Sequence, residues 1–180
     1  MPARARRSDA RDNHALLLAA ARAVFAEDGP DAPLDRIARR AGIGNATMYR
    51  HFPSRRELVI AVYAGEVASL TSGARLDAAD PGAELFAWLA SFAEHVRDKR
   101  DLALSLTTPA GGHETLFAQW HSTMNETAAA LVDRAKAAGA VTPDTDPLDL
   151  LLLATGVALA NAPARTPHLL ALVRRAVSTP

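Results

Sequence analysis

Apolar residues in this chain recur three and four positions apart, and glycine or proline residues interrupt the recurrence. This spacing places the apolar side chains on one face of an α-helix. Alternating runs of Val, Ile and Thr, which are typical of β-strands, are scarce. The pattern therefore predicts an all-α protein of about nine helices, with a three-helix unit at the N-terminus and a helical bundle after it.

Cap and stop signals set the expected helix boundaries. Residues 1–7 form a basic arm without an apolar stripe, and we expect it to stay outside the first helix. Pro33 suits a first helical turn, Ser54 and Glu57 form a capping box, and Asp146 caps a helix that begins at Pro147. The expected helices are 8–28, about 31–41, 45–51, 54–71, 81–97, 113–138, 147–161 and 168–177, with a shorter apolar segment at 102–108.

Residues 33–52 have the pattern of a helix-turn-helix. Gly42 stops the first helix of the pair, and Gly44 or Asn45 opens the second, since Asn is a good N-cap. The second helix, residues 45–51, is short and has little apolar surface. It is a poor core element, and we interpret it as a reading helix that a separate core supports.

Composition narrows the class of protein. Of the 180 residues, 49% are hydrophobic and 22% are charged, which is typical of a globular chain. The chain has no cysteine, so disulfides, zinc ribbons and thiol nucleophiles are excluded. The longest apolar run, residues 150–160, falls short of the ~20 residues that a membrane span needs. We expect a cytoplasmic protein with no membrane partner.

The net charge of zero conceals an uneven distribution. Residues 1–60 hold 11 Arg against 7 acids, whereas residues 61–180 hold 9 Lys and Arg against 13 acids. A basic excess at one end indicates a polyanionic partner there, although scattered surface charge is the alternative interpretation. The excess coincides with the helix-turn-helix, which favours DNA as the partner.

One run of residues also resembles a known family. It comprises Phe25, Gly29, Ile37-Ala38, Ala41-Gly42-Ile43, Thr47-Met48-Tyr49, His51-Phe52, Ser54-Arg55 and Leu58. Over residues 11–62 the chain resembles the N-terminal domain of TetR/AcrR-type transcriptional repressors. The resemblance implies a DNA-binding domain at 1–57, including the N-terminal arm, and a ligand-binding and dimerisation domain at 58–180. It also implies a homodimer on a palindromic operator of double-stranded DNA, released by a small effector.

The chain departs from the family pattern at three places. The family usually has Thr or Ser at the start of the second helix, where this chain has Ala32-Pro33-Leu34, so that hydroxyl contact to a phosphate is in doubt. Gly44 replaces the usual Ser, which weakens a cap. Ala46 replaces a common Gly, which changes the surface offered to the groove.

The major groove, about 12 Å wide, admits one α-helix, and residues early in that helix reach the base edges. We expect Asn45, Ala46, Thr47 and Arg50 to face the bases. By the resemblance, Tyr49, His51 and Arg55 are expected to bind phosphates. Arg39 and Arg40 are either close to the DNA backbone or solvated charges on the second helix.

The apolar residues of 148–161 cover nearly every side of the expected helix, so all its sides need cover. We expect it to pair, together with the last helix, with the same two helices of a second copy. The alternative is a central core helix in a monomer. The expected interface residues are Leu148, Leu151, Leu152, Thr155, Leu159, Leu169, Leu170, Val173 and Val177.

The effector pocket is expected among large residues of intermediate polarity in the C-terminal domain. For each of them residue type alone favours the alternative interpretation, that it belongs to the plain core. As a set of pocket residues, they indicate a largely apolar or aromatic effector. The candidates are Trp88, Phe92, His95, Leu106, Trp120, His121 and Met124. No metal or cofactor is expected, because His113 and His121 stand eight apart, about 12 Å along a helix.

The sequence does not favour an enzyme. It contains no phosphate-binding glycine loop, no HExxH zinc motif and no G-x-S-x-G nucleophile elbow. An all-α enzyme is therefore a distant alternative. The nearer alternatives to a repressor are a transcriptional activator and an architectural helix-turn-helix protein, which the sequence does not separate.

Overall fold

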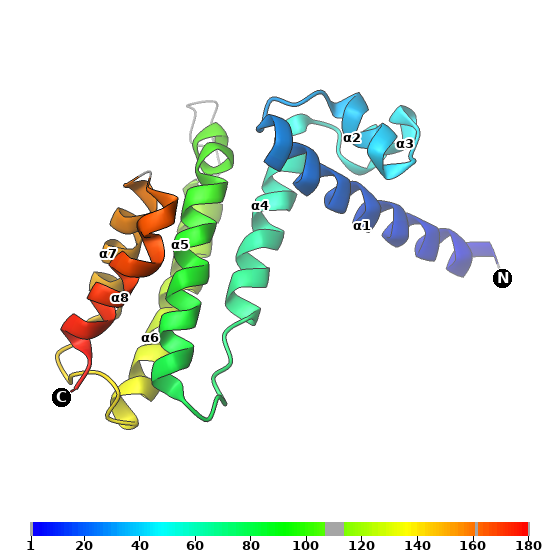
Figure 1. Ribbon diagram of the computed structural model, residues 1–180. Coiled ribbons are helices and arrows are strands. Elements are labelled where there is room, and N and C mark those ends of the chain that lie inside the picture. Colours follow the sequence, from blue (N-terminus) through cyan, green and yellow to red (C-terminus); the bar gives the residue numbers. More distant parts are fainter. Residues whose placement is uncertain (1, 107–113, 161, 180) are drawn as a thin grey trace. The chain divides into compact units, whose positions relative to one another are not determined.

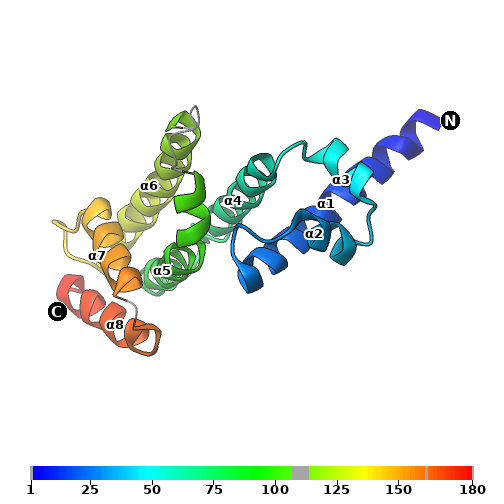
Figure 2. The same ribbon diagram turned by 90° about the horizontal axis from the view of Figure 1, so that it is seen from above.

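The computed structural model describes residues 2–106, 114–160 and 162–179, and the side chains within 11–105, 116–160 and 162–179. The described part consists of helices and their connections (Figures 1 and 2). The elements are α1 Pro2–Asp28, α2 Leu34–Ala41, α3 Asn45–His51, α4 Arg55–Ser72, α5 Pro81–Leu106, α6 Glu114–Ala137, α7 Pro147–Leu159, the 3-10 helix η1 Pro163–Arg165 and α8 Thr166–Val177. The all-α prediction is confirmed.

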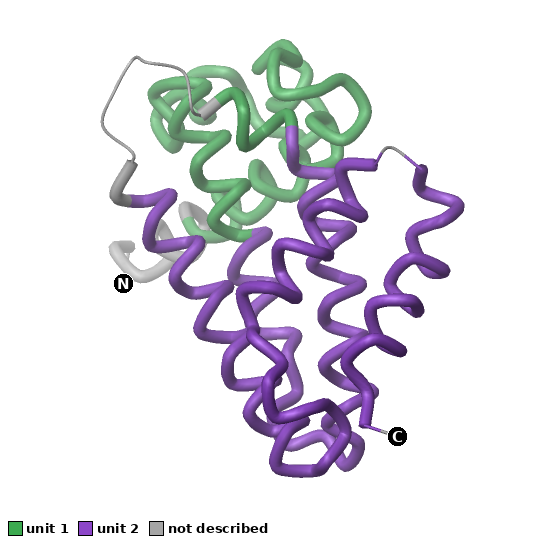
Figure 3. The backbone as a smooth tube through the Cα atoms, turned by 90° about the vertical axis from the view of Figure 1, so that its left-hand side faces the viewer, with its two compact units in different colours: residues 1–65, 101–109 green, residues 66–100, 110–180 purple. Residues whose placement is uncertain are grey.

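The chain divides into two compact units (Figure 3). Unit 1 comprises residues 1–65 and 101–109, and unit 2 comprises residues 66–100 and 110–180. The helices α4 and α5 each contribute residues to both units.

The core of unit 1 holds α3 in place. Leu17 and Val24 of α1, Ile37 of α2, Met48 of α3 and Leu58 of α4 have no exposed surface. The turn between α2 and α3 is short because Gly42 adopts φ 68°, a conformation that glycine reaches without strain. The Ile43 amide then donates to the Ala38 carbonyl at 2.9 Å, which closes the end of α2.

The core of unit 2 comes from one stripe of each long helix. Leu85 and Leu89 of α5, Leu131 of α6 and Leu150 of α7 are all buried. The helix α6 packs on α7, and α7 packs on α8. The indole Nε1 of Trp88 donates to the carbonyl of Leu70 at 3.0 Å, so the one polar atom of this buried ring has a partner.

Two expected boundaries are wrong. The first helix begins at Pro2 rather than at Ser8 or Asp9, so residues 2–7 are helical. The segments 81–97 and 102–108 are one helix as far as Leu106. In both places the apolar stripe fades, but the residues are good helix formers without glycine or internal proline, and the helix continues.

The cap residues predicted helix ends more reliably than the apolar stripe did. The Glu57 amide donates to Ser54 Oγ at 3.2 Å, and the Ser54 amide donates to the Glu57 carboxylate at 3.3 Å, which confirms the capping box. Asp146 accepts from the Leu148 amide at 2.7 Å, as expected. Pro33 is the N-cap of α2 rather than its first residue, and Gly44 rather than Asn45 is the N-cap of α3.

None of the described helices combines the length and the apolar character that a membrane-spanning segment requires.

Candidate nucleic-acid interface

The helix α3 presents one face and buries the other. Asn45, Ala46 and Arg50 are exposed, and Tyr49 is 50% exposed although its ring is large and largely apolar. Met48 is fully buried, and Phe52 directly after the helix is 4% exposed. A helix of seven residues cannot hold its position by its own hydrogen bonds, so these two anchors fix it to the core.

Arg50 lies back along its own helix. Its Nη2 donates to Thr47 Oγ1 at 2.7 Å, and its Nε donates to the Ala46 carbonyl at 3.2 Å. The structure therefore joins Arg50 and Thr47, two of the expected base-facing residues. A contact from Arg50 to a base edge requires a different rotamer that releases the Thr47 hydroxyl.

His51 lies at the end of α3 beside a residue of α1 that the sequence did not single out. The His14 ring is 6.1 Å from the His51 ring in an edge arrangement and 4.9 Å from the Phe52 ring. These contacts connect α1 to the end of α3. His14 precedes the core residue Leu17 by three positions, and this helical spacing was the one available signal.

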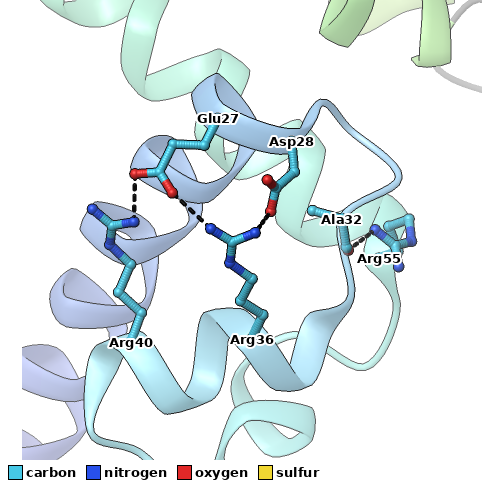
Figure 4. Close-up of polar contacts among 6 residues, drawn as sticks. All are labelled: Glu27, Asp28, Ala32, Arg36, Arg40 and Arg55. Atoms are coloured by element: carbon cyan, nitrogen blue, oxygen red, sulfur yellow. Dashed lines mark hydrogen bonds and ion pairs between the residues drawn. The ribbon is translucent and has the colours of Figure 1, made fainter.

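Arg55, an expected phosphate ligand, has a second role in the structure. Its Nη1 donates to the main-chain carbonyl of Pro30 at 2.9 Å. It also donates to the main-chain carbonyl of Ala32 (Figure 4). The first turn of α4 is thereby tied to the segment between α1 and α2. Sequence analysis did not foresee this contact, because its acceptors are main-chain atoms more than twenty positions away.

The arginines of α2 pair with acids of the same unit (Figure 4). Glu27 at the end of α1 accepts from Arg36 at 2.8 Å and from Arg40 at 2.6 Å, and Asp28 also pairs with Arg36. Such exposed pairs contribute ~0–1 kcal/mol each and are screened by salt. Arg40 is therefore a half-exposed partner of Glu27. Its closeness to the DNA backbone stays a prediction.

Arg39 is the most exposed of these arginines. Its side chain is 78% exposed and pairs with Asp35, one turn earlier on α2, at 3.1 Å. The charge of Asp35 is thereby balanced within the helix.

Six of the expected pocket residues belong to unit 2, whereas Leu106 belongs to unit 1. Phe92, Trp120 and Met124 are buried, whereas His121 is exposed and its Nδ1 lies 2.7 Å from the Phe117 carbonyl. Leu106 is the last residue of α5, and its side chain lies outside the described residues, as does His113.

Trp88 and His95 each line a hollow between residues of α4 and α5. The hollow at Trp88 has a volume of about 380 Å³ and also includes Arg75 and Glu84. The hollow at His95 has a volume of about 230 Å³ and includes Glu66 and Lys99, which form an ion pair at 3.4 Å. Both linings are more polar than the apolar pocket that the sequence indicated.

Burial and neighbouring groups shift the pKa values of His95 and Glu84, which line these hollows. Burial lowers the pKa of His95, and Glu66 opposes this effect. Hydrogen bonds from the Arg75 main chain and guanidinium lower the pKa of Glu84, which is 5% exposed and ionised at neutral pH. Among the described residues, no three His, Asp or Glu side chains are grouped as a metal site.

The helices α7 and α8 leave large apolar side chains uncovered. Leu148, Leu152 and Leu159 are 54%, 61% and 51% exposed. Leu151 is 5% exposed within its own chain, so it belongs to the core of unit 2. Thr155, Leu169, Leu170, Val173 and Val177 are half-buried.

Both parts of the chain match models of known families. Residues 17–62 match the model described as bacterial regulatory proteins, tetR family. Residues 80–177 match the model described as transcriptional regulator SbtR-like, C-terminal domain.

Two solved structures are similar over nearly the whole chain. The TetR transcriptional regulator SCO0520 from Streptomyces coelicolor is 33% identical with a TM-score of 0.79, and the match covers 92% of this chain and 98% of that chain. The TetR transcription regulatory protein from Mycobacterium vanbaalenii is 30% identical with a TM-score of 0.79, covering 96% and 99%.

Curated relatives match over a shorter length. The HTH-type transcriptional activator FasR of Mycolicibacterium smegmatis is 45% identical over 60 residues, which is 33% of this chain. The HTH-type transcriptional regulator TtgW of Pseudomonas putida is 40% identical over 63 residues. The chain spans 27% and 47% of the lengths of these two proteins.

Proposed function

This chain belongs to the TetR family of bacterial transcriptional regulators, and we propose that it is a homodimeric repressor that releases a palindromic operator when a small effector binds. Its family and fold are those of DNA-binding regulators rather than of enzymes. The observation that carries the proposal is the exposed polar face of α3, anchored from behind by the fully buried Met48.

The exposed face of α3 has the chemistry that a major groove accepts. Asn45 is suited to a bidentate pair with adenine, and Arg50 to one with guanine, once Arg50 has left Thr47. Ala46 and the Thr47 methyl group suit contact with a thymine methyl. Tyr49, His51 and Arg55 flank this face and are proposed to bind phosphates, which fixes the helix in the groove.

The exposed leucines of α7 and α8 support a homodimer. An uncovered row formed by Leu148, Leu152 and Leu159 leaves apolar surface in water, and burial of such surface contributes about 25 cal/mol per Å². We propose that the same row of a second copy covers it, joined by Thr155, Leu169, Leu170, Val173 and Val177. A two-fold dimer places its reading helices one duplex turn apart, about 34–36 Å, and therefore selects a palindrome.

The effector is proposed to bind in unit 2. Trp88 offers an aromatic surface, and Glu84, Glu66 and His95 supply polar groups in the two hollows. An effector can release DNA only if its affinity differs between the DNA-binding and the free conformation.

A transcriptional activator is the second candidate, because the relative FasR is named an activator. The chemistry of α3 is the same in both cases, since the position of the operator relative to the promoter decides the outcome. Transcription from a reporter promoter with and without the purified protein separates the two.

Selection of bound sequences from a random pool of duplexes tests the proposal. The purified protein should enrich a palindrome, with half-sites one turn apart, and affinity should fall steeply with salt. Failure to enrich any palindrome, or an affinity that does not change with salt, would contradict the proposal.

The two tryptophans offer a test of the effector site. Trp88 lines a hollow and Trp120 does not line either of the two described here. A metabolite that releases the operator should change the fluorescence of the Trp120→Phe variant, in which Trp88 remains. The Trp88→Phe variant serves as the matched comparison, and a signal confined to Trp120 would place the effector elsewhere.

A further inference from the structure

The guanidinium of Arg50 is held against its own helix. Its Nε donates to the Ala46 carbonyl at 3.2 Å, and its Nη2 donates to Thr47 Oγ1 at 2.7 Å. Residues three and four positions apart lie on one helical face, so both acceptors stand beside the Arg50 side chain. Ala46 and Arg50 are exposed, so these contacts lie on the surface of α3 that is proposed to enter the major groove.

The hydroxyl of Thr47 is the stronger of the two acceptors. A distance of 2.7 Å is at the short end of the range for N–H···O hydrogen bonds, and the donor carries a charge. Thr47 is half-buried, and a β-branched side chain has few rotamers in a helix, which keeps Oγ1 in place. In the free protein, this hydrogen bond therefore stabilises the conformation in which Arg50 lies back along the helix.

Arg50 exchanges one partner for another when it reads a base. A bidentate contact to guanine N7 and O6 requires a rotamer in which the guanidinium has left Thr47. The free energy of the lost hydrogen bond is then subtracted from the free energy of the new contact. Opposite any other base, Arg50 keeps its bond to Thr47, and nothing is subtracted. The hydroxyl therefore weakens binding to the preferred base pair alone.

We propose that Thr47 sets the strength of the base preference of Arg50, because its hydroxyl competes with guanine for the guanidinium. This inference rests on the proposed function. Thr47 acts through Arg50 and is in this respect a positioning residue, while its methyl group remains available for the thymine contact. The consequence is that removal of the hydroxyl sharpens the preference for guanine, although a polar group has left the reading face.

The test compares Thr47→Val with Thr47→Ser. Valine keeps the β-branch and a methyl group but has no hydrogen-bond acceptor, whereas serine keeps the hydroxyl and loses the methyl group. Each change is also made in the Arg50→Ala background. The probes are the operator selected by wild type and an exchanged operator, in which the base pair that Arg50 reads is replaced in both half-sites. Selection with Arg50→Ala identifies that base pair as the one at which the preference is lost.

The ratio of affinities for the two operators reports the preference. Thr47→Val should bind the selected operator more tightly than wild type, by roughly 2- to 10-fold for each half-site, because no hydrogen bond to Thr47 has to be broken. It should bind the exchanged operator as wild type does. Thr47→Ser should keep the wild-type ratio. In the Arg50→Ala background, Thr47→Val should leave the ratio unchanged.

The outcomes separate this inference from the proposed function. If wild-type protein binds no duplex, both are overturned. If wild type binds the operator and the ratio for Thr47→Val is equal to or below that of wild type, only the role of Thr47 is overturned. The same holds if Arg50→Ala keeps the wild-type preference at every base pair. A loss of affinity in Thr47→Val that persists in the Arg50→Ala background also overturns this role, because the hydroxyl then contacts the DNA itself.

Discussion

The Nη1 of Arg55 donates to the Pro30 carbonyl at 2.9 Å, across 25 positions of sequence. The first turn of α4 is thereby fixed to the segment that leads into the helix-turn-helix. The contact is partly buried, and the guanidinium carries a charge. Its loss should therefore lower the free energy of unfolding more than the loss of an ordinary surface contact.

Arg55→Ala should lower the free energy of unfolding by about 1–3 kcal/mol, because two main-chain carbonyls lose a charged donor. It should also weaken binding to all duplexes alike. Arg100→Ala, an exposed arginine of unit 2, is the control. Denaturant unfolding measures the first effect and DNA titration the second, and an unchanged unfolding midpoint would show that Arg55 does not brace α4.

Arg50→Ala should relax the preference at one base pair by about 1–3 kcal/mol, because the bidentate donor to a base edge is lost. Stability should change little, since the hydrogen bonds of the Arg50 side chain to described residues stay within its own helix, with Thr47 and Ala46. Selection from a random pool with the variant reads the preference position by position. If the variant prefers the same sequence as wild type, Arg50 contacts a phosphate rather than a base edge.

Leu152→Glu should convert the dimer to a monomer. Leu152 is 61% exposed in the single chain, and a carboxylate there would be buried opposite its own copy in the proposed dimer. Leu76→Glu is the matched control, because Leu76 is 42% exposed and lies outside α7 and α8. Analytical ultracentrifugation measures the mass, and a Leu152→Glu dimer of wild-type affinity would contradict this interface.

Acid should destabilise the chain partly through His95. Burial lowers the pKa of His95, and Lys99 adds to this effect, while Glu66 and Asp98 oppose it. Below the ordinary histidine pKa of about 6.5, the unfolded chain therefore binds more protons at this site than the folded chain. The stability that this site contributes above that pH is lost as the pH falls.

His95→Gln should therefore flatten the dependence of unfolding free energy on pH between about 7.5 and 5.5. Chemical denaturation of both proteins at a series of pH values measures the difference. His168→Gln, at an exposed histidine of α8, is the control for the substitution itself. If the unfolding free energy depends on pH in the same way in wild type and His95→Gln, His95 is not the source of that dependence.

Features that depend on neighbours within a few residues could be predicted from the sequence. The capping box of Ser54 and Glu57, the Asp146 cap and the bounds of α3 follow from local hydrogen bonds and backbone preferences. Where the apolar stripe faded, at residues 2–7 and 98–101, periodicity was a poor guide, because helix propensity alone carries α1 and α5 onward.

The partners of residues far apart in the sequence could not be predicted, because they depend on how the helices pack. Arg36 and Arg40 pair with Glu27, Arg55 binds the Pro30 carbonyl, and His14 lies beside His51. The chain offers these arginines many acceptors, and spacing along the sequence does not rank them. The packing of α1, α2 and α4 in unit 1 brings one acceptor to Arg40 and two each to Arg36 and Arg55. In unit 2, packing buries Leu151 and leaves Leu152 exposed.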